Sequence, residues 1–220
     1  HPWINKALER AQQKVEARNF DIRKTLLKFD NVLNDQRQVI FSQRNEVIEN
    51  NDAKQYSENF LDEIIEDLKL KKTKKLANVG SNEINMQLKS LFGKSFEDNE
   101  INELVNIDNR QFEEKIKIKF TKSREERVKL LNEEQYYEIE KRIFLQLIDQ
   151  NWKLHIQYLE QLRQVIGLRS YGQRDPLVEY KKEAFTLFEN LLNKLKYDLI
   201  TILFNLKLIE KNDEYEKDNE

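Results

Sequence analysis

The sequence predicts an all-α protein with a long N-terminal helix, a C-terminal antiparallel two-helix hairpin and a small inserted helical subdomain. Three observations support this fold class. The 220 residues include only four Gly and two Pro, so few positions interrupt a helix. Apolar residues recur at spacings of three and four, the period of a helix face. Charged residues make up 35% of the chain and the mean hydropathy is -0.82. Such a polar composition suits elongated helices better than a sphere.

The first helix is expected over residues 2–49. Pro2 suits its first turn, where the missing N–H costs no hydrogen bond. Over this length the helix would measure about 70 Å. A small domain cannot cover such a rod, so part of it should dock elsewhere. Its apolar stripe consists of Ile4, Leu8, Ala11, Val15, Ile22, Leu26, Phe29, Leu33, Ile40 and Val47.

Three polar residues fill positions that this stripe skips. They are Arg18, Gln36 and Gln43. A pure coiled coil would place apolar residues there. The pattern therefore indicates a helix that meets different neighbours along its length.

The remaining chain divides at changes of pattern. The insert should contain short helices around Phe60–Leu68, Met86–Phe92 and Ile101–Phe120. Its basic run Lys69–Lys75 is interpreted as a solvated helix face, with a phosphate-binding patch as the alternative. The predicted divisions are a long helix at 1–49, an inserted helical subdomain at 50–132, a hairpin part at 133–210 and a polar tail at 211–220.

The hairpin follows from a second long pattern that begins at Glu133. The segment 167–176 carries two Gly and one Pro, so it should be the hairpin loop. A final helix is expected from Leu177 to about Ile209. The apolar girth of the first hairpin helix predicts neighbours on more than one side.

The composition disfavours several kinds of chemistry. Lys and Arg number 38 against 40 Asp and Glu, which argues against a nucleic-acid binder. Cysteine is absent, so disulfides and thiolate sites are excluded. No phosphate-binding glycine motif occurs. The histidines are His1 and His155, and we expect His155 to make a helix-face hydrogen bond instead of ligating a metal. We therefore predict no catalytic, cofactor-binding or metal-binding residue.

Four other side chains invite a structural interpretation. Arg124 and Arg127 alternate with acidic residues, which indicates a solvated, salt-bridged face. Trp3 and Trp152 are expected to be anchors that pack between helices.

The hairpin tip is the candidate contact site. Arg169, Tyr171, Gln173 and Arg174 lie together on the loop. An aromatic residue between Arg residues is suited to binding a polypeptide or a partner protein. Tyr171 folding back over the hairpin end is an equally weighted alternative.

Two long segments resemble the SecA family of bacterial preprotein translocases. Residues 15–24, with Phe29-Asp30, Asn34–Arg37 and Ser42–Glu46, resemble its central scaffold helix, as His1–Trp3 resemble the residues before it. Residues 162–176 and 179–185 resemble its two-helix finger. Here Ser170 and Gly172 stand where the family pattern predicts Gly and Ala.

The resemblance implies a fragment of an ATP-driven motor. It implies that residues 1–49 and 133–210 are the two parts of the family's helical scaffold domain, the second including the two-helix finger, and that residues 50–132 are its helical wing domain. The motor domains that bind ATP and Mg²⁺ would lie outside this chain, so the fragment itself should be no enzyme. Implied partners are the SecYEG channel, the preprotein and the parent's motor and preprotein cross-linking domains, and a homodimer stays open. The implied location is the cytoplasm, peripheral at the inner face of the cell membrane. The start at His1, without Met, suggests an excised piece.

Two alternatives come from other functional classes. A free-standing helical adaptor or coiled-coil protein would self-associate along residues 4–47. An all-α metal or acid/base enzyme is disfavoured, because the sequence offers no clustered ligands.

Overall fold

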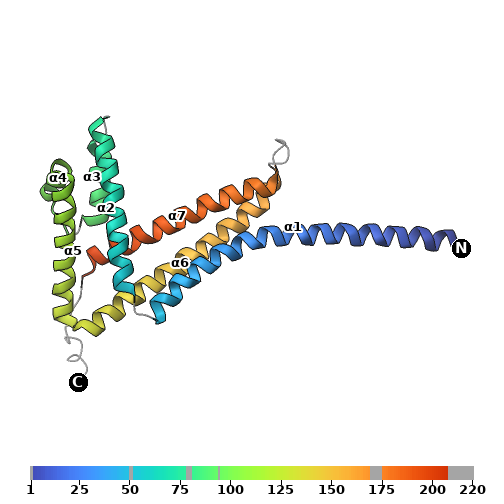
Figure 1. The fold of residues 1–220 in the computed structure, drawn as a ribbon, viewed down its shortest axis with the longest axis horizontal. Helices are drawn as coiled ribbons and strands as arrows, with labels where there is room; N and C mark the ends of the chain where they lie inside the picture. Colours follow the sequence, from blue (N-terminus) through green and yellow to red (C-terminus); the bar gives the residue numbers. More distant parts are fainter. Residues whose placement is uncertain (1, 50–51, 78–80, 94, 169–174, 208–220) are drawn as a thin grey trace, which may run out of the picture. The chain divides into compact units, whose positions relative to one another are not determined.

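The computed structural model describes all residues except 1, 50–51, 78–80, 94, 169–174 and 208–220. The described residues form seven α-helices and no strand, which confirms the all-α prediction (Figure 1). The helices are α1 (Pro2–Glu49), α2 (Ala53–Ala77), α3 (Ser81–Phe92), α4 (Asp98–Asn106), α5 (Asn109–Leu131), α6 (Glu133–Ile166) and α7 (Pro176–Asn205).

The starts of these helices follow local capping chemistry. Asp108 accepts hydrogen bonds from the backbone N–H groups of Arg110 and Gln111, both at 2.8 Å, and so begins α5. Asn132 has a φ of 69° and a ψ of 164°, a backbone conformation outside the helical regions that separates α5 from α6. Its Oδ1 then accepts from the N–H of Gln135 at 3.0 Å and caps α6. Asp175 caps α7 in the same way, with Pro176 at its first position.

Two predicted bounds were wrong. The expected helix 101–120 is divided between α4 and α5, because α4 ends at Asn106 with Ile107 as its C-cap and the N-cap Asp108 then starts a new helix. The last helix ends at Asn205 instead of near residue 209. There Asn205 donates to the carbonyls of Leu91 and Thr201, and Arg127 donates to the carbonyl of Leu206 at 3.1 Å. The predicted starts at Pro2 and Glu133 are confirmed.

The chain forms two compact units. Unit 1 comprises residues 1–49 and 148–193, and unit 2 comprises residues 50–147 and 194–220. Helices α6 and α7 therefore contribute to both units. This division rests on contacts within the chain, whereas the predicted scaffold and wing bounds follow the order of sequence segments and stay a prediction.

Unit 2 has a core rich in aromatic residues. The rings of Phe60 and Phe144 meet edge to face with centroids 5.8 Å apart. Phe204, near the end of α7, stacks at 4.5 Å on Phe92 and at 5.0 Å on Phe120. Offset and edge-on geometries of this kind stabilise packing beyond the apolar area that they bury.

Candidate functional site

In unit 1, the second half of α1 packs on the hairpin of α6 and α7 (Figure 1). The ring of Phe29 meets that of Tyr180 edge to face, with centroids 4.8 Å apart. The buried cluster at this junction consists of Phe29, Leu159, Leu162, Ile166, Tyr180 and Ala184. Both helices of the hairpin therefore contribute apolar residues to the face that α1 contacts. The broad apolar surface of residues 133–166 predicted neighbours on more than one side.

A buried polar bridge joins all three helices of this junction. The Gln36 amide nitrogen donates to the Ala184 carbonyl at 3.1 Å, and its oxygen lies 2.8 Å from His155 Nε2. Since the amide oxygen only accepts, His155 carries its proton on Nε2. Burial lowers the pKa of His155 to about 4, so the ring is neutral at pH 7. The predicted hydrogen bond of His155 is confirmed.

Two ion pairs flank the bridge. Arg163 in α6 contacts Asp30 at 3.3 Å, and Arg44 in α1 contacts Asp149 at 3.1 Å. Because α1 residues of rising number meet α6 residues of falling number, the two helices run antiparallel. Solvent-exposed pairs contribute little stability, so the buried core and its polar bridge dominate this junction.

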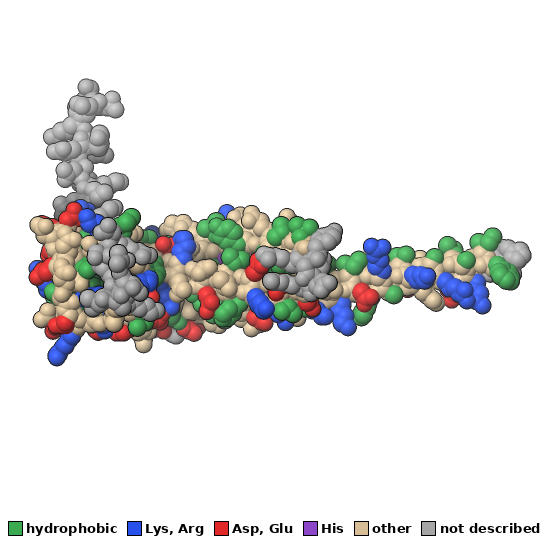
Figure 2. All heavy atoms as spheres, turned by 90° about the horizontal axis from the view of Figure 1, so that it is seen from above, with side chains coloured by type: hydrophobic (Ala, Val, Ile, Leu, Met, Phe, Trp, Pro, Cys, Tyr) green, Lys and Arg blue, Asp and Glu red, His purple; other side chains and the backbone are tan. Residues whose placement is uncertain are grey.

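The first half of α1 has no cover within the described residues. Every described residue from Trp3 to Lys28 is exposed. The apolar stripe is therefore divided: Phe29, Ile40 and Val47 are buried, whereas Ile4, Leu8, Val15, Ile22 and Leu26 are exposed. We call these five residues the free stripe. Figure 2 shows apolar and basic side chains interspersed along this part of the helix.

The two tryptophans have different environments. Trp152 is buried, 5.5 Å from the ring of His155. Trp3 is 81% exposed, so the expectation that it packs between helices of this chain is wrong. It lies one residue before the free stripe, and no other described residue of the chain covers it.

The predicted fingertip residues Arg169, Tyr171, Gln173 and Arg174 lie outside the described residues. The chain enters this segment after Leu168, which is 66% exposed. It leaves through Asp175, whose carboxylate accepts from the Leu177 N–H at 2.8 Å. The structure therefore describes both supports of the tip, and the tip's role stays a prediction.

Arg124 does not lie on a solvated face, so that interpretation is wrong. Its side chain is buried and donates to Glu140 at 2.7 Å, to Ser57 at 2.6 Å and to Glu58 at 2.9 Å. Ser57 also donates to Glu140 at 2.5 Å. Arg127 is equally buried, with its guanidinium over the ring of Tyr136. Both arginines therefore belong to the interior of unit 2.

The basic run is also used in packing, so its interpretation as a solvated face was wrong in part. Lys72 is buried and donates to the carbonyls of Leu104 and Ile107 at the end of α4. Its ammonium also lies 5.1 Å from the centre of the Phe112 ring. A cation at the carbonyl end of a helix is favourable. Lys69 binds Glu66 at 2.6 Å and Glu113 at 2.7 Å, and these partners leave neither lysine available to an anion.

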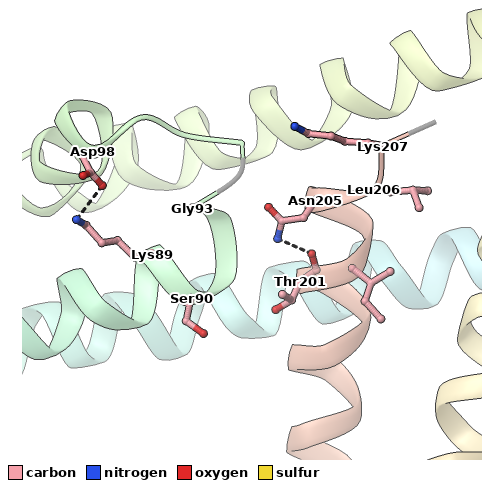
Figure 3. A pocket seen from close by; sticks show the side chains of 9 residues that line it. Lys89, Ser90, Gly93, Asp98, Thr201, Asn205, Leu206 and Lys207 are labelled. Atoms are coloured by element: carbon pink, nitrogen blue, oxygen red, sulfur yellow. Dashed lines mark hydrogen bonds and ion pairs between the residues drawn. The ribbon is translucent and has the colours of Figure 1, made fainter. Parts of the chain in front are cut away.

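Unit 2 also contains an open pocket of about 680 Å³ (Figure 3). Its polar groups pair with each other. Lys89 contacts Asp98 at 2.8 Å, and Asn205 donates to Thr201. No group of three or more potential metal ligands occurs within the described ranges of the chain. The pocket thus has no convergent set of side chains that would identify a ligand.

None of the described helices combines the length and the apolar composition needed to cross a bilayer. The features that remain as a candidate site are the free stripe and the supported hairpin tip. The free stripe is an exposed apolar helix face suited to binding a polypeptide, and the role of the tip stays a prediction.

Comparison with known proteins identifies the family of the chain. Residues 1–207 match the model of the SecA Wing and Scaffold domain. The chain is 66% identical over 214 residues to the protein translocase subunit SecA of Pelagibacter ubique (strain HTCC1062). That match covers 97% of this chain and 25% of the relative, so the chain spans about a quarter of the length of the curated relative it matches. The chain belongs to the SecA wing and scaffold family.

Proposed function

We propose that this chain is the scaffold and wing part of an ATP-driven protein translocase. Motor domains elsewhere in the parent hydrolyse ATP with Mg²⁺, and α1 transmits their motion to the hairpin. The fingertip residues Arg169, Tyr171, Gln173 and Arg174 contact the preprotein at the SecYEG channel. The parent works in the cytoplasm at the inner face of the cell membrane, and the chain by itself hydrolyses no ATP.

The observation that carries the proposal is the division of the apolar stripe of α1. Its second half is buried against the chain's own hairpin, while its first half is exposed. Burying one such side chain stabilises a complex by about 1.5–3 kcal/mol. A helix with both properties can link the hairpin rigidly to a second body, which is what a lever between motor and finger requires.

The stripe's role can be tested in the full-length translocase that carries this segment. We expect Ile4→Ser with Leu8→Ser and Val15→Ser to reduce preprotein transport into SecYEG vesicles strongly. The matched control is Gln13→Ser, which changes an exposed side chain on the opposite side of the same helix. Transport equal to wild type in the triple variant, with its helix content retained, would remove the stripe from the mechanism.

The fingertip needs its own experiment in the same full-length protein. Tyr171→Ala should lower transport while the ATPase activity without preprotein persists. Tyr171→Phe keeps the aromatic ring and should retain most of the transport. Unimpaired transport by the alanine variant would show that Tyr171 is no contact residue. ATP turnover by the isolated chain above background would contradict the domain assignment.

A second candidate function is that of a helical adaptor that assembles through the free stripe. It is favoured by the same exposed residues, whose spacing suits a helix–helix seam. It predicts a homodimer of the isolated chain that Leu8→Lys dissociates. Sedimentation velocity distinguishes the two, because the translocase proposal reserves the stripe for other parts of the parent and expects a monomer.

A further inference from the structure

The part of α1 that includes the hairpin contacts follows a strict heptad period. Alternating steps of four and three run through Ile22, Leu26, Phe29, Leu33, Gln36, Ile40, Gln43 and Val47. Such a stripe does not by itself define one axial position of the helix, because a slip of seven residues brings each position of the heptad to the place of the same position in the next heptad. The slip moves the helix by about 10 Å along its axis. A heptad stripe therefore needs another feature to fix its register.

Apolar burial does not oppose a slip in one direction. If the exposed half of α1 moved onto the hairpin, Ile22 would take the place of Phe29 beside Tyr180. Ile22 is 48% exposed in the present register and would become covered. Each buried apolar residue of the stripe would be replaced by the apolar residue that lies seven positions before it. The place of Gln36 is the exception, because Phe29 would take it. The hydrophobic effect alone would thus allow the hairpin to cover Ile22 and Leu26, the last two residues of the free stripe, in exchange for the buried place of Val47.

The surface charges oppose this slip only weakly. Arg37 would take the place of Arg44 and keep an arginine beside Asp149. Arg23 would take the place of Asp30 and face Arg163. Charges this exposed are screened by solvent and salt, so their repulsion is a weak barrier.

Gln36 is different, because its partners are buried and come from two other helices. In the slipped register His155 would face the ring of Phe29. Its Nε2–H would lose the Gln36 acceptor in a surround that includes the rings of Trp152 and Phe188, at 5.5 and 5.7 Å. A buried donor without an acceptor is costly. The contact between the Phe29 ring and the buried His155 N–H therefore raises the free energy of the slipped register.

We propose that Gln36, His155 and the Ala184 carbonyl form a register latch. The latch holds α1 at one axial position on the hairpin and so keeps Ile22 and Leu26 of the free stripe available for a partner. It acts on the fold of unit 1 itself and does not depend on which partner binds the stripe. The Gln36→Leu/His155→Leu pair removes both polar side chains and leaves no orphaned donor or acceptor between them, so the variant should still fold.

The slip can be measured by spin-label distances. The chain has no cysteine, so Asn45→Cys and Gln164→Cys introduce the only two thiols. Both positions are exposed and lie several turns apart along the antiparallel pair α1 and α6. With the labelled 220-residue chain diluted in unlabelled chain, we expect one narrow distance distribution. In the Gln36→Leu/His155→Leu background a second population should appear at a distance longer by about 10 Å, since residue 45 moves away from residue 164.

Two controls make the test specific. Gln43→Leu removes the neighbouring polar residue of the stripe, whose amide oxygen is buried without a partner among the described residues, and should leave a single distance. The exchange Gln36→His with His155→Gln keeps a donor–acceptor pair and should restore the single distance. A single unchanged distance in the double leucine variant would overturn the latch. So would a second population in the exchanged variant.

Discussion

The amide oxygen of Gln36 in α1 lies 2.8 Å from Nε2 of His155 in α6, although 119 residues separate them in sequence. The same amide donates to the Ala184 carbonyl in α7. One side chain thus connects the long helix to both arms of the hairpin. The connection lies near the point where the buried half of the apolar stripe begins, so it determines how much of α1 remains for other partners.

The His155 environment predicts a pH dependence of stability. The pKa of His155 falls from 6.5 to about 4 on folding, because burial disfavours the charged ring. Between these pH values the unfolded chain binds more protons, so the free energy of unfolding rises with pH. The contribution is fully present above pH 6.5 and is lost as pH falls toward 4, by up to about 3 kcal/mol. Urea unfolding of unit 1, followed by Trp152 fluorescence, measures it.

The control for this prediction is His155→Gln, which keeps a hydrogen-bonding side chain without a titrating ring. The difference between wild type and this variant should shrink steadily from pH 7 to pH 4. A difference that does not change with pH would show that His155 keeps its ordinary pKa in the folded chain.

A second prediction concerns the buried pair of Arg124 and Glu140. Glu140→Ala leaves the Arg124 guanidinium buried without its closest carboxylate, which costs about 3–5 kcal/mol of stability. Glu138→Ala is the matched control on the same helix, because Glu138 is exposed and its ion pair with Lys141 is long, at 3.9 Å. The cost of this control substitution should stay below about 1 kcal/mol. Chemical denaturation monitored by circular dichroism compares them. Equal costs would mean that the buried network contributes no stability of its own.

The sequence was sufficient for the helices whose limits depend on local chemistry. Residues 2–49 contain no helix breaker after Pro2, and Glu133 begins a second long apolar pattern with acidic residues in its first turn. The length of the first helix also predicted that part of it would stay uncovered. These features depend on neighbouring residues, so their signals are present in short stretches of sequence.

Arg124 and Lys72 were misinterpreted because their partners are distant in sequence. Arg124 donates a hydrogen bond to Ser57, and Lys72 donates one to the Leu104 carbonyl. A signal was present in both cases. Arg124 continues the four-residue spacing of Phe112, Ile116 and Phe120, and Lys72 comes four residues after Leu68. A basic residue that continues an apolar stripe is a candidate for burial with a partner, but the sequence alone does not identify that partner.

A third prediction follows from the position of Lys72. Lys72→Met keeps the apolar stem but leaves the carbonyls of Leu104 and Ile107 without the ammonium donor. The free energy of unfolding of unit 2 should fall by about 1–3 kcal/mol. Lys71→Met is the control, since Lys71 forms a half-exposed pair with Asp67 and should cost under about 1 kcal/mol. If Lys72 were solvated, the two substitutions would have the same effect in a denaturation series.

The last prediction uses Trp3 as a reporter for the free stripe. Trp3 is 81% exposed and Trp152 is 9% exposed, so Trp152→Phe leaves a chain whose fluorescence comes from an exposed indole. Iodide should quench that emission almost freely in the isolated chain. In the full-length translocase with its other tryptophans replaced, quenching should fall, because a partner surface that covers Ile4 and Leu8 also reaches the preceding residue. The Leu8→Lys variant should recover free quenching by displacing that surface. Quenching that is equally strong in the isolated chain and in the full-length protein would show that the stripe stays open to solvent, and the proposed link between α1 and the rest of the translocase would then be wrong.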